Sequence, residues 1–152
     1  MTLEQQLQVI IDDAPDYGIP SAIVAKAIAP SLKSFAEQLQ NLEYYILQNL
    51  DGDWVLTIIT NPRLQQDKRV IYAFTSVQDA ANFQGKANPN LVAAPISSVQ
   101  LLFRLFSLQQ VDSIIFLDRQ NLSQGIEIER SQLSKSIKQQ LEKLKQIPPH
   151  IA

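Results

Sequence analysis

The stretch that decides the fold is Arg69-Val70-Ile71-Tyr72-Ala73-Phe74-Thr75-Ser76-Val77-Gln78-Asp79-Ala80-Ala81, near the middle of a chain of 152 residues. Its first half is β-branched and aromatic, and apolar side chains fall on both faces of an extended backbone, as in a central strand. Ser76 and Asp79 then have the spacing of a capping box, which predicts a helix as far as Gln84. A strand that passes directly into a helix predicts a mixed α and β fold.

On the N-terminal side of this stretch the sequence predicts helices first. Residues 3–13 carry an apolar stripe at helical spacing. A second helix is expected over residues 19–28 and is stopped by Pro30, after which Ser31 would cap a third helix. The stripe of the first helix consists of Leu3, Leu7, Ile10 and Ile11.

Strands follow from about residue 43. The Asp51-Gly52 pair between residues 44–49 and 54–60 predicts a β-hairpin of two antiparallel strands. Beyond the opening stretch, the sequence predicts a strand at 91–95, a helix capped by Ser97, a strand at 113–117, a loop from Asp118 to Gly125, a strand at 125–128 and a helix at 131–146.

Together these elements predict an α+β fold: a mainly antiparallel, mixed sheet of about five strands packed with helices and preceded by an N-terminal helical subdomain. The length is that of one domain. We therefore expect a single domain over residues 1–152, with the helical subdomain at 1–42 and the core with its C-terminal helix at 43–147. Whether residues 1–40 pack on the sheet is left open by the sequence.

Composition excludes several kinds of protein. The chain has no cysteine, so disulfides, thiolate nucleophiles and cysteine-bound metals are excluded. No apolar run approaches the length of a membrane span, and the first thirty residues do not resemble a secretory signal. A pI of about 5.3 and the lack of an Arg-rich stripe argue against nucleic acid. We expect a soluble, cytoplasmic protein with no membrane partner, no metal and no cofactor.

Charge is distributed unevenly along the chain. Residues 1–60 carry eight acidic and two basic side chains, whereas residues 61–152 carry seven acidic and eleven basic ones. The two parts therefore have net charges of −6 and +4. Such a division would allow electrostatic complementarity between the two parts or between two copies of the chain, and it is equally compatible with two solvated surfaces.

One family resemblance rests on the order of elements from residue 43 to about 135. The strand ending in Ala73-Phe74-Thr75-Ser76, the helix, the strand that reaches Pro95, the second helix and the glycine at Gly125 before the last strand resemble the N-terminal domain of the SseB protein family. The resemblance leaves the first forty residues outside. It implies the α+β core. That domain is associated with serine sensitivity by name and has no established catalytic residues to transfer, so no reaction is implied.

Polar residues at the ends of two predicted strands are the candidates for binding a small ligand. Asp118 and Arg119 follow a buried strand, a position where ligand-binding loops often lie. Thr75 and Ser76 could donate hydrogen bonds to a phosphate at a helix N-terminus, although no glycine-rich loop precedes them. Turn formation and helix capping are the structural interpretations of the same residues.

Apolar and aromatic residues are the candidates for binding a protein partner. Tyr44 and Tyr45 point to opposite faces of one strand, so one of them should be exposed, and Trp54 follows the hairpin turn. Leu3 and Leu7 belong to a stripe that needs a partner. Glu127 and Glu129 share one strand face, which fits either a carboxylate pair or a protected sheet edge.

These observations predict a protein that is not an enzyme but an SseB-like interaction or regulatory module. Its partner would be an unidentified protein or a second copy of the chain, as in a homodimer. The alternative is a small-ligand-binding protein or cryptic enzyme that uses the loop after Leu117. A pocket lined by Asp118, Arg119 and Thr75 would favour the alternative, and an apolar self-complementary patch would favour the interaction module.

Overall fold

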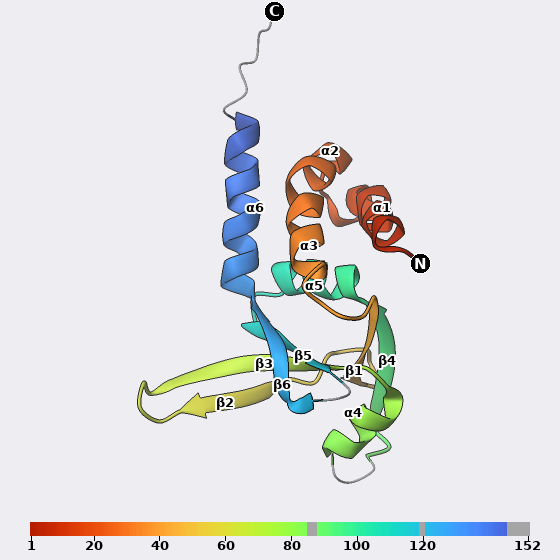
Figure 1. Ribbon diagram of the computed structural model, residues 1–152, viewed down its shortest axis with the longest axis vertical. Coiled ribbons are helices and arrows are strands. Elements are labelled where there is room, and N and C mark those ends of the chain that lie inside the picture. Colours follow the sequence, from red (N-terminus) through yellow and green to blue (C-terminus); the bar gives the residue numbers. More distant parts are fainter. Residues whose placement is uncertain (85–87, 119–120, 146–152) are drawn as a thin grey trace, which may run out of the picture.

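The computed structural model describes residues 1–84, 88–118 and 121–145, with the backbone alone described at 118 and 121–124. Its fold is α+β (Figure 1). The strands are β1 (Glu43–Asn49), β2 (Thr57–Asn61), β3 (Gln66–Phe74), β4 (Leu91–Ser97), β5 (Ser113–Asp118) and β6 (Asn121–Glu129). The helices are α1 (Leu3–Asp13), η1 (Ala14–Tyr17), α2 (Ser21–Ile23), η2 (Val24–Ile28), α3 (Ala29–Ala36), α4 (Val77–Gln84), α5 (Ser98–Ser107) and α6 (Arg130–Lys145).

A mostly antiparallel sheet is the centre of the molecule. Its strand order is β4-β1-β3-β5-β6, and β2 pairs with β3 off this path. Only the β3–β5 pair is parallel. The sheet has six described strands, where about five were expected. β3 lies in its middle, and its second half, Val70–Phe74, carries buried residues on both faces, which confirms the prediction of a central strand.

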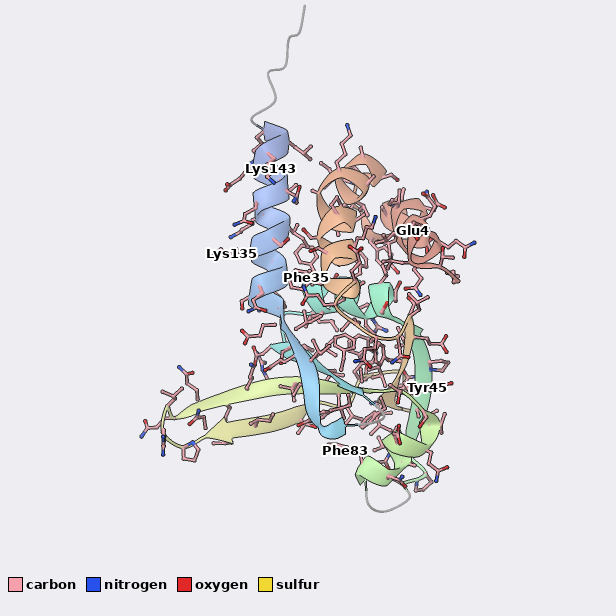
Figure 2. The ribbon with its side chains drawn as sticks, viewed as in Figure 1. Glu4, Phe35, Tyr45, Phe83, Lys135 and Lys143 are labelled. Atoms are coloured by element: carbon pink, nitrogen blue, oxygen red, sulfur yellow. The ribbon has the colours of Figure 1, made fainter. Side chains whose placement is uncertain are left out.

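Helices cover the two faces of the sheet unequally. In Figure 1, α1, α3, α5 and α6 lie on one side, and α4 lies on the other. Figure 2 shows Phe35 among the helices of the larger layer, and Tyr45 and Phe83 on the α4 side. The larger layer shares one buried cluster with the sheet, whereas the smaller cluster around Phe74 and Ala80 lies under α4. This arrangement follows from strand alternation, because Ile71 and Ala73 face one layer while Phe74 faces the other.

The N-terminal helices are part of the main core. Leu7, Ile10 and Leu32 are buried in the same cluster as Val99 of α5 and Ile137 of α6. None of the helices in the described part of the chain is long and apolar enough to cross a membrane.

Pro30 does not stop the second helix, contrary to the expectation. The helix continues through η2, a π-helical turn in which the Ala29 N–H donates to the Val24 carbonyl, into α3. The wider turn accommodates a proline, which lacks an N–H and whose ring would collide with the carbonyl four residues earlier. Ser31 therefore lies inside a helix and does not cap one. Its buried Oγ is 2.8 Å from Ser136 Oγ on α6.

The predicted hairpin between residues 44–49 and 54–60 is wrong in its pairing, although its turn exists. The turn places Gly52 at φ +86°, in the left-handed region that favours glycine. β1 pairs instead with β4 and, at Tyr45 and Ile46, with β3. The two predicted strands are joined by a single isolated antiparallel β-bridge between Gln48 and Trp54. The nine-residue β3 is long enough to pair with β1 through its second half and with β2 through its first.

Local signals elsewhere were reliable, with one exception. The Asp79 N–H donates to Ser76 Oγ and the Gln100 N–H donates to Ser97 Oγ, each at 3.1 Å, so both predicted helix caps are confirmed. The exception is the predicted loop from Asp118 to Gly125, because β6 already begins at Asn121. Gly125 lies inside this strand, where the backbone runs so close to β5 that a Cβ atom would be 2.8 Å from the Phe116 carbonyl oxygen.

Candidate partner-binding surface

The residues predicted to bind a small ligand do not form a described site. Thr75 Oγ1 donates to Asp79 Oδ2 at 3.1 Å, and Ser76 Oγ accepts from the Asp79 N–H, so both hydroxyl groups take part in the cap of α4. The side chain of Asp118 and the whole of Arg119 lie outside the described residues. Capping is therefore the role that the described contacts give to Thr75 and Ser76.

Two of the residues predicted to bind a partner are buried within this chain. Leu7 is in the main core, and Tyr44 packs edge-on against Phe116 with ring centroids 5.0 Å apart. The Tyr44 hydroxyl also accepts the N–H of Asn41 at 3.3 Å. Leu3 is partly buried beside the same cluster. Leu7 and Tyr44 are buried because the stripe of α1 and this face of β1 pack against the chain's own helices. Tyr45, on the opposite face of β1, is half-buried against the smaller cluster, so neither tyrosine is fully exposed as expected.

Trp54, the remaining candidate, is partly buried at the side of the sheet. The Arg104 guanidinium of α5 lies over its ring, 4.3 Å from the centroid. Both side chains line a cleft of about 390 Å³ together with Asp53 and Leu56. Nε1 of Trp54 is buried and has no hydrogen-bond partner among the described residues. Trp54 thus contributes to packing between α5 and the segment that leads into β2.

An exposed apolar surface lies next along the chain, on a hairpin that we call the arm, residues 57–69. Figure 1 shows β2 and the first half of β3 projecting away from the rest of the molecule. β5 begins opposite Val70, so the sheet beside β3 ends where the arm starts. Ile58 and Leu64 are each 63% exposed. The exposed large apolar residues of this region are Leu50, Leu56, Ile58, Ile59 and Leu64.

The arm has an open backbone edge. The Arg69 N–H donates to Asp112 Oδ2 and its carbonyl accepts from the Asp112 N–H, each at 2.8 Å, so the backbone groups of Arg69 face away from β2. Arg69 lies opposite Ile58, and Asp67 lies opposite Thr60. Because hydrogen-bonded and non-hydrogen-bonded pairs alternate in an antiparallel ladder, the N–H and C=O groups of Ile58 and Thr60 point outward from β2. In the described part of the chain β2 pairs with β3 alone.

This edge carries none of the usual protection against pairing with another chain. The five residues of β2 are Thr57-Ile58-Ile59-Thr60-Asn61, with no charge and no proline among them. Natural edge strands are commonly protected by lysine, proline or a bulge. An exposed, β-branched and uncharged edge is a template for another strand.

A charged cleft of about 560 Å³ lies between the arm and the start of α6. Lys68 Nζ is 2.5 Å from Glu127 Oε2 and 3.3 Å from Glu129 Oε1. Ser113 Oγ donates to Glu127 Oε2 at 2.6 Å. Burial acts to raise the pKa of Glu127, but the hydrogen bonds from Lys68 and Ser113 outweigh it and hold the pKa below its usual value.

The same contacts act on Lys68 in the opposite sense. Burial acts to lower its pKa, but hydrogen bonds and charge from Glu127 and then Glu129 outweigh burial and raise the pKa. At neutral pH the lysine is therefore a cation held between two carboxylates. The cluster joins the base of the arm to β6.

The arm's edge was missed by sequence reasoning, which assigned β2 a partner in β1. The uncharged Thr-Ile-Ile-Thr run was a signal for an open edge. Only the strand order, however, shows that this strand pairs on one side and leaves its other side open. No protein-family model matches this chain, and a search of curated proteins gave no match either.

Proposed function

We propose that this protein is a non-enzymatic interaction module of the SseB-like kind, and that the arm is its partner-binding surface. The observation that carries the proposal is the open edge of β2, on which backbone donors and acceptors of Ile58 and Thr60 lie beside exposed isoleucine side chains. The interaction surface thus lies on the arm, one element further along the chain than the Trp54 hairpin.

Strand addition is the mode of recognition that fits this surface. An extended segment that pairs with an open edge gains main-chain hydrogen bonds, and alternate side chains supply the specificity. On β2 the alternate side chains are Ile58 on one face and Ile59 on the other, because successive residues of a strand point to opposite faces. The Lys68 cluster holds the base of the arm in place, which lowers the entropy lost on binding.

The small-ligand alternative has less support among the described residues. The hydroxyl groups of Thr75 and Ser76 are used in capping. Of the charged residues that line the cleft, Lys68 is paired with Glu127 and Glu129, and Asp112 Oδ2 lies 3.6 Å from Arg69 Nε. These pairs reduce the net attraction that the cleft offers to a charged ligand.

Photo-crosslinking from the arm tests the proposal. A photoreactive residue is placed at Ile58 in the full chain, the protein is irradiated in native lysate, and adducts are identified by mass spectrometry. The matched control carries the same residue at Lys138, an exposed position on α6. We expect a discrete adduct from position 58 and none of the same mass from position 138. Equal labelling from both positions, or none from position 58, would refute the proposal.

A further inference from the structure

We propose that the strand added to β2 is β2 of a second copy of this chain, in antiparallel pairing about a two-fold axis through Ile59. This inference rests on the proposed function, because it names the partner that occupies the arm's edge. The resulting contact would join two sheets into one.

The hydrogen-bond pattern of β2 allows this pairing in one register. The outward-facing groups belong to Ile58 and Thr60, on either side of Ile59. A two-fold axis at Ile59 places Ile58 of one copy opposite Thr60 of the other, so each pair exchanges two backbone hydrogen bonds and the dimer gains four. An axis at Ile58 or Thr60 would require outward groups at residue 56 or at Pro62, beyond the ends of the strand. Proline has no N–H to donate.

The side chains along this axis are compatible with self-association. Ile59 would meet its own copy as a non-hydrogen-bonded pair, in which side chains approach most closely. β2 contains no charged residue, so no like charges meet in the paired region. Isologous contacts require such a self-complementary surface.

Charges just outside the strand favour the antiparallel direction. Asp51 and Asp53 precede β2, and Arg63 follows it. Because Arg63 lies in the turn that follows β2, the antiparallel dimer brings this turn of one copy toward the end of β2 that follows Asp53 in the other copy. A parallel arrangement would bring the acidic ends together and the basic ends together. The antiparallel dimer is therefore favoured electrostatically at both of its ends.

The arm also provides room for a second molecule. It leaves the body of the protein on the side where β5 begins and β6 ends, as Figure 1 shows. α4, which packs on β1, β3 and β4, lies at the other end of the sheet. Two copies can thus meet through their arms while their helical layers remain apart.

A cysteine scan tests the register, and the chain is suited to it because it contains no cysteine. In Ile59→Cys the two thiols would lie at the two-fold axis, at about 4.5 Å between Cα atoms for a non-hydrogen-bonded pair, which a disulfide can bridge. In Ile58→Cys each thiol faces Thr60 of the other copy, and the two thiols lie too far apart. Ile58 is more exposed than Ile59, at 63% against 39%, so random collision would favour Ile58→Cys. Under mild oxidation we expect rapid covalent dimer from Ile59→Cys and little from Ile58→Cys.

Sedimentation of the purified full chain over a range of concentrations measures the dimer without any cross-link. We expect a monomer–dimer equilibrium that Ile59→Lys weakens by at least about tenfold, since like charges would meet directly at the axis. Ile59→Val, which keeps a β-branched side chain, should retain the dimer, and circular dichroism checks that each variant is folded.

The outcomes separate this inference from the proposed function. A chain that stays monomeric at every concentration, or that cross-links as fast from position 58 as from position 59, overturns the homodimer. If such a chain still gives a discrete adduct with another protein from Ile58 in lysate, the arm is a partner-binding surface for a different protein, and the proposed function stands without the dimer.

Discussion

Gln6 provides a direct test of how firmly the N-terminal helices are joined to the rest of the molecule. It is buried on α1, and its side chain makes three contacts with segments far away in sequence. Nε2 donates to the Leu42 carbonyl at 2.9 Å, and Oε1 accepts from Ser98 Oγ and from the Val99 N–H, each at 3.3 Å. The last of these satisfies one of the N–H groups that the first turn of α5 leaves without a helical partner.

The expected effect of Gln6→Ala follows from these contacts. A typical intramolecular hydrogen bond contributes about 0.5–1.5 kcal/mol, and a buried group left without a partner costs about 1–3 kcal/mol. Because two of the three bonds are long, we expect the free energy of unfolding to fall by about 2–4 kcal/mol. For a chain of this length that corresponds to a decrease in Tm of about 5–15 °C.

Urea unfolding followed by circular dichroism measures this loss, with Gln8→Ala as the matched control. Gln8 lies on the same helix but is exposed, and its side chain bonds only to Asp12 one turn away. We expect Gln8→Ala to change stability by less than about 0.5 kcal/mol. A loss as small in Gln6→Ala, or a separate early transition for the helices alone, would show that Gln6 does not join the two parts and that the reasoning is wrong.

Substitutions at three further positions test the sheet and the cap of α4. Glu127→Gln should lower stability at about pH 7 by up to about 1 kcal/mol, because side chains this exposed form weak ion pairs. Since the folded pKa of Glu127 lies below the usual 4.5, its contribution is present above that pH and is lost as the pH falls through the folded pKa, so the urea midpoints of the variant and the parent should converge in acid. A variant that stayed equally destabilised in acid would argue against the ion pair. Gly125→Ala should cost about 1–3 kcal/mol, because its Cβ would be 2.7 Å from Ile115 Cγ2 and 2.8 Å from a backbone oxygen; thermal melts in which it matched the parent would contradict the close approach of β6. Ser76→Ala should lose about 1 kcal/mol with the cap of α4, and Ser76→Asp should retain most of it, as measured by the same melts.

The sequence predicted those features that depend on near neighbours along the chain. The strand up to Phe74, the caps at Ser76 and Ser97 and the amphipathic α1 all rest on side-chain spacing within a few residues. Pro30 was interpreted by the rule that proline ends a helix, and the rule failed because a π-turn widened the helix just before it. The continuous helix also contacts α6 through Ser31 and Ser136, which are far apart in sequence and which no local pattern connects.

The partners of strands were harder to predict than the strands themselves. The turn at Gly52 was recognised, yet β2 pairs with β3, because the competition between β1 and β2 is decided by the length of β3 and by β4. The residues of the candidate site were likewise easier to assign to strands than to bring together across strands. Glu127 and Glu129 were placed on one face, but Lys68 could be added only once β3, β5 and β6 were known to be neighbours. The open edge of β2 was hidden for the same reason.

The parallel pairing of β3 with β5 has a consequence for the chain as it is being made. The second half of β3, which ends at Phe74, is apolar on both faces. Its parallel neighbour β5 begins at Ser113, about forty residues later. At about 5–20 residues synthesised per second, β5 follows β3 out of the ribosome by roughly 2–8 s, while a hairpin such as β2–β3 closes in about 1–10 μs. For most of that time the edge of β3 that later pairs with β5 has no partner strand. The nascent chain, more than the finished one, is the form in which this protein is most exposed to pairing with the wrong strand.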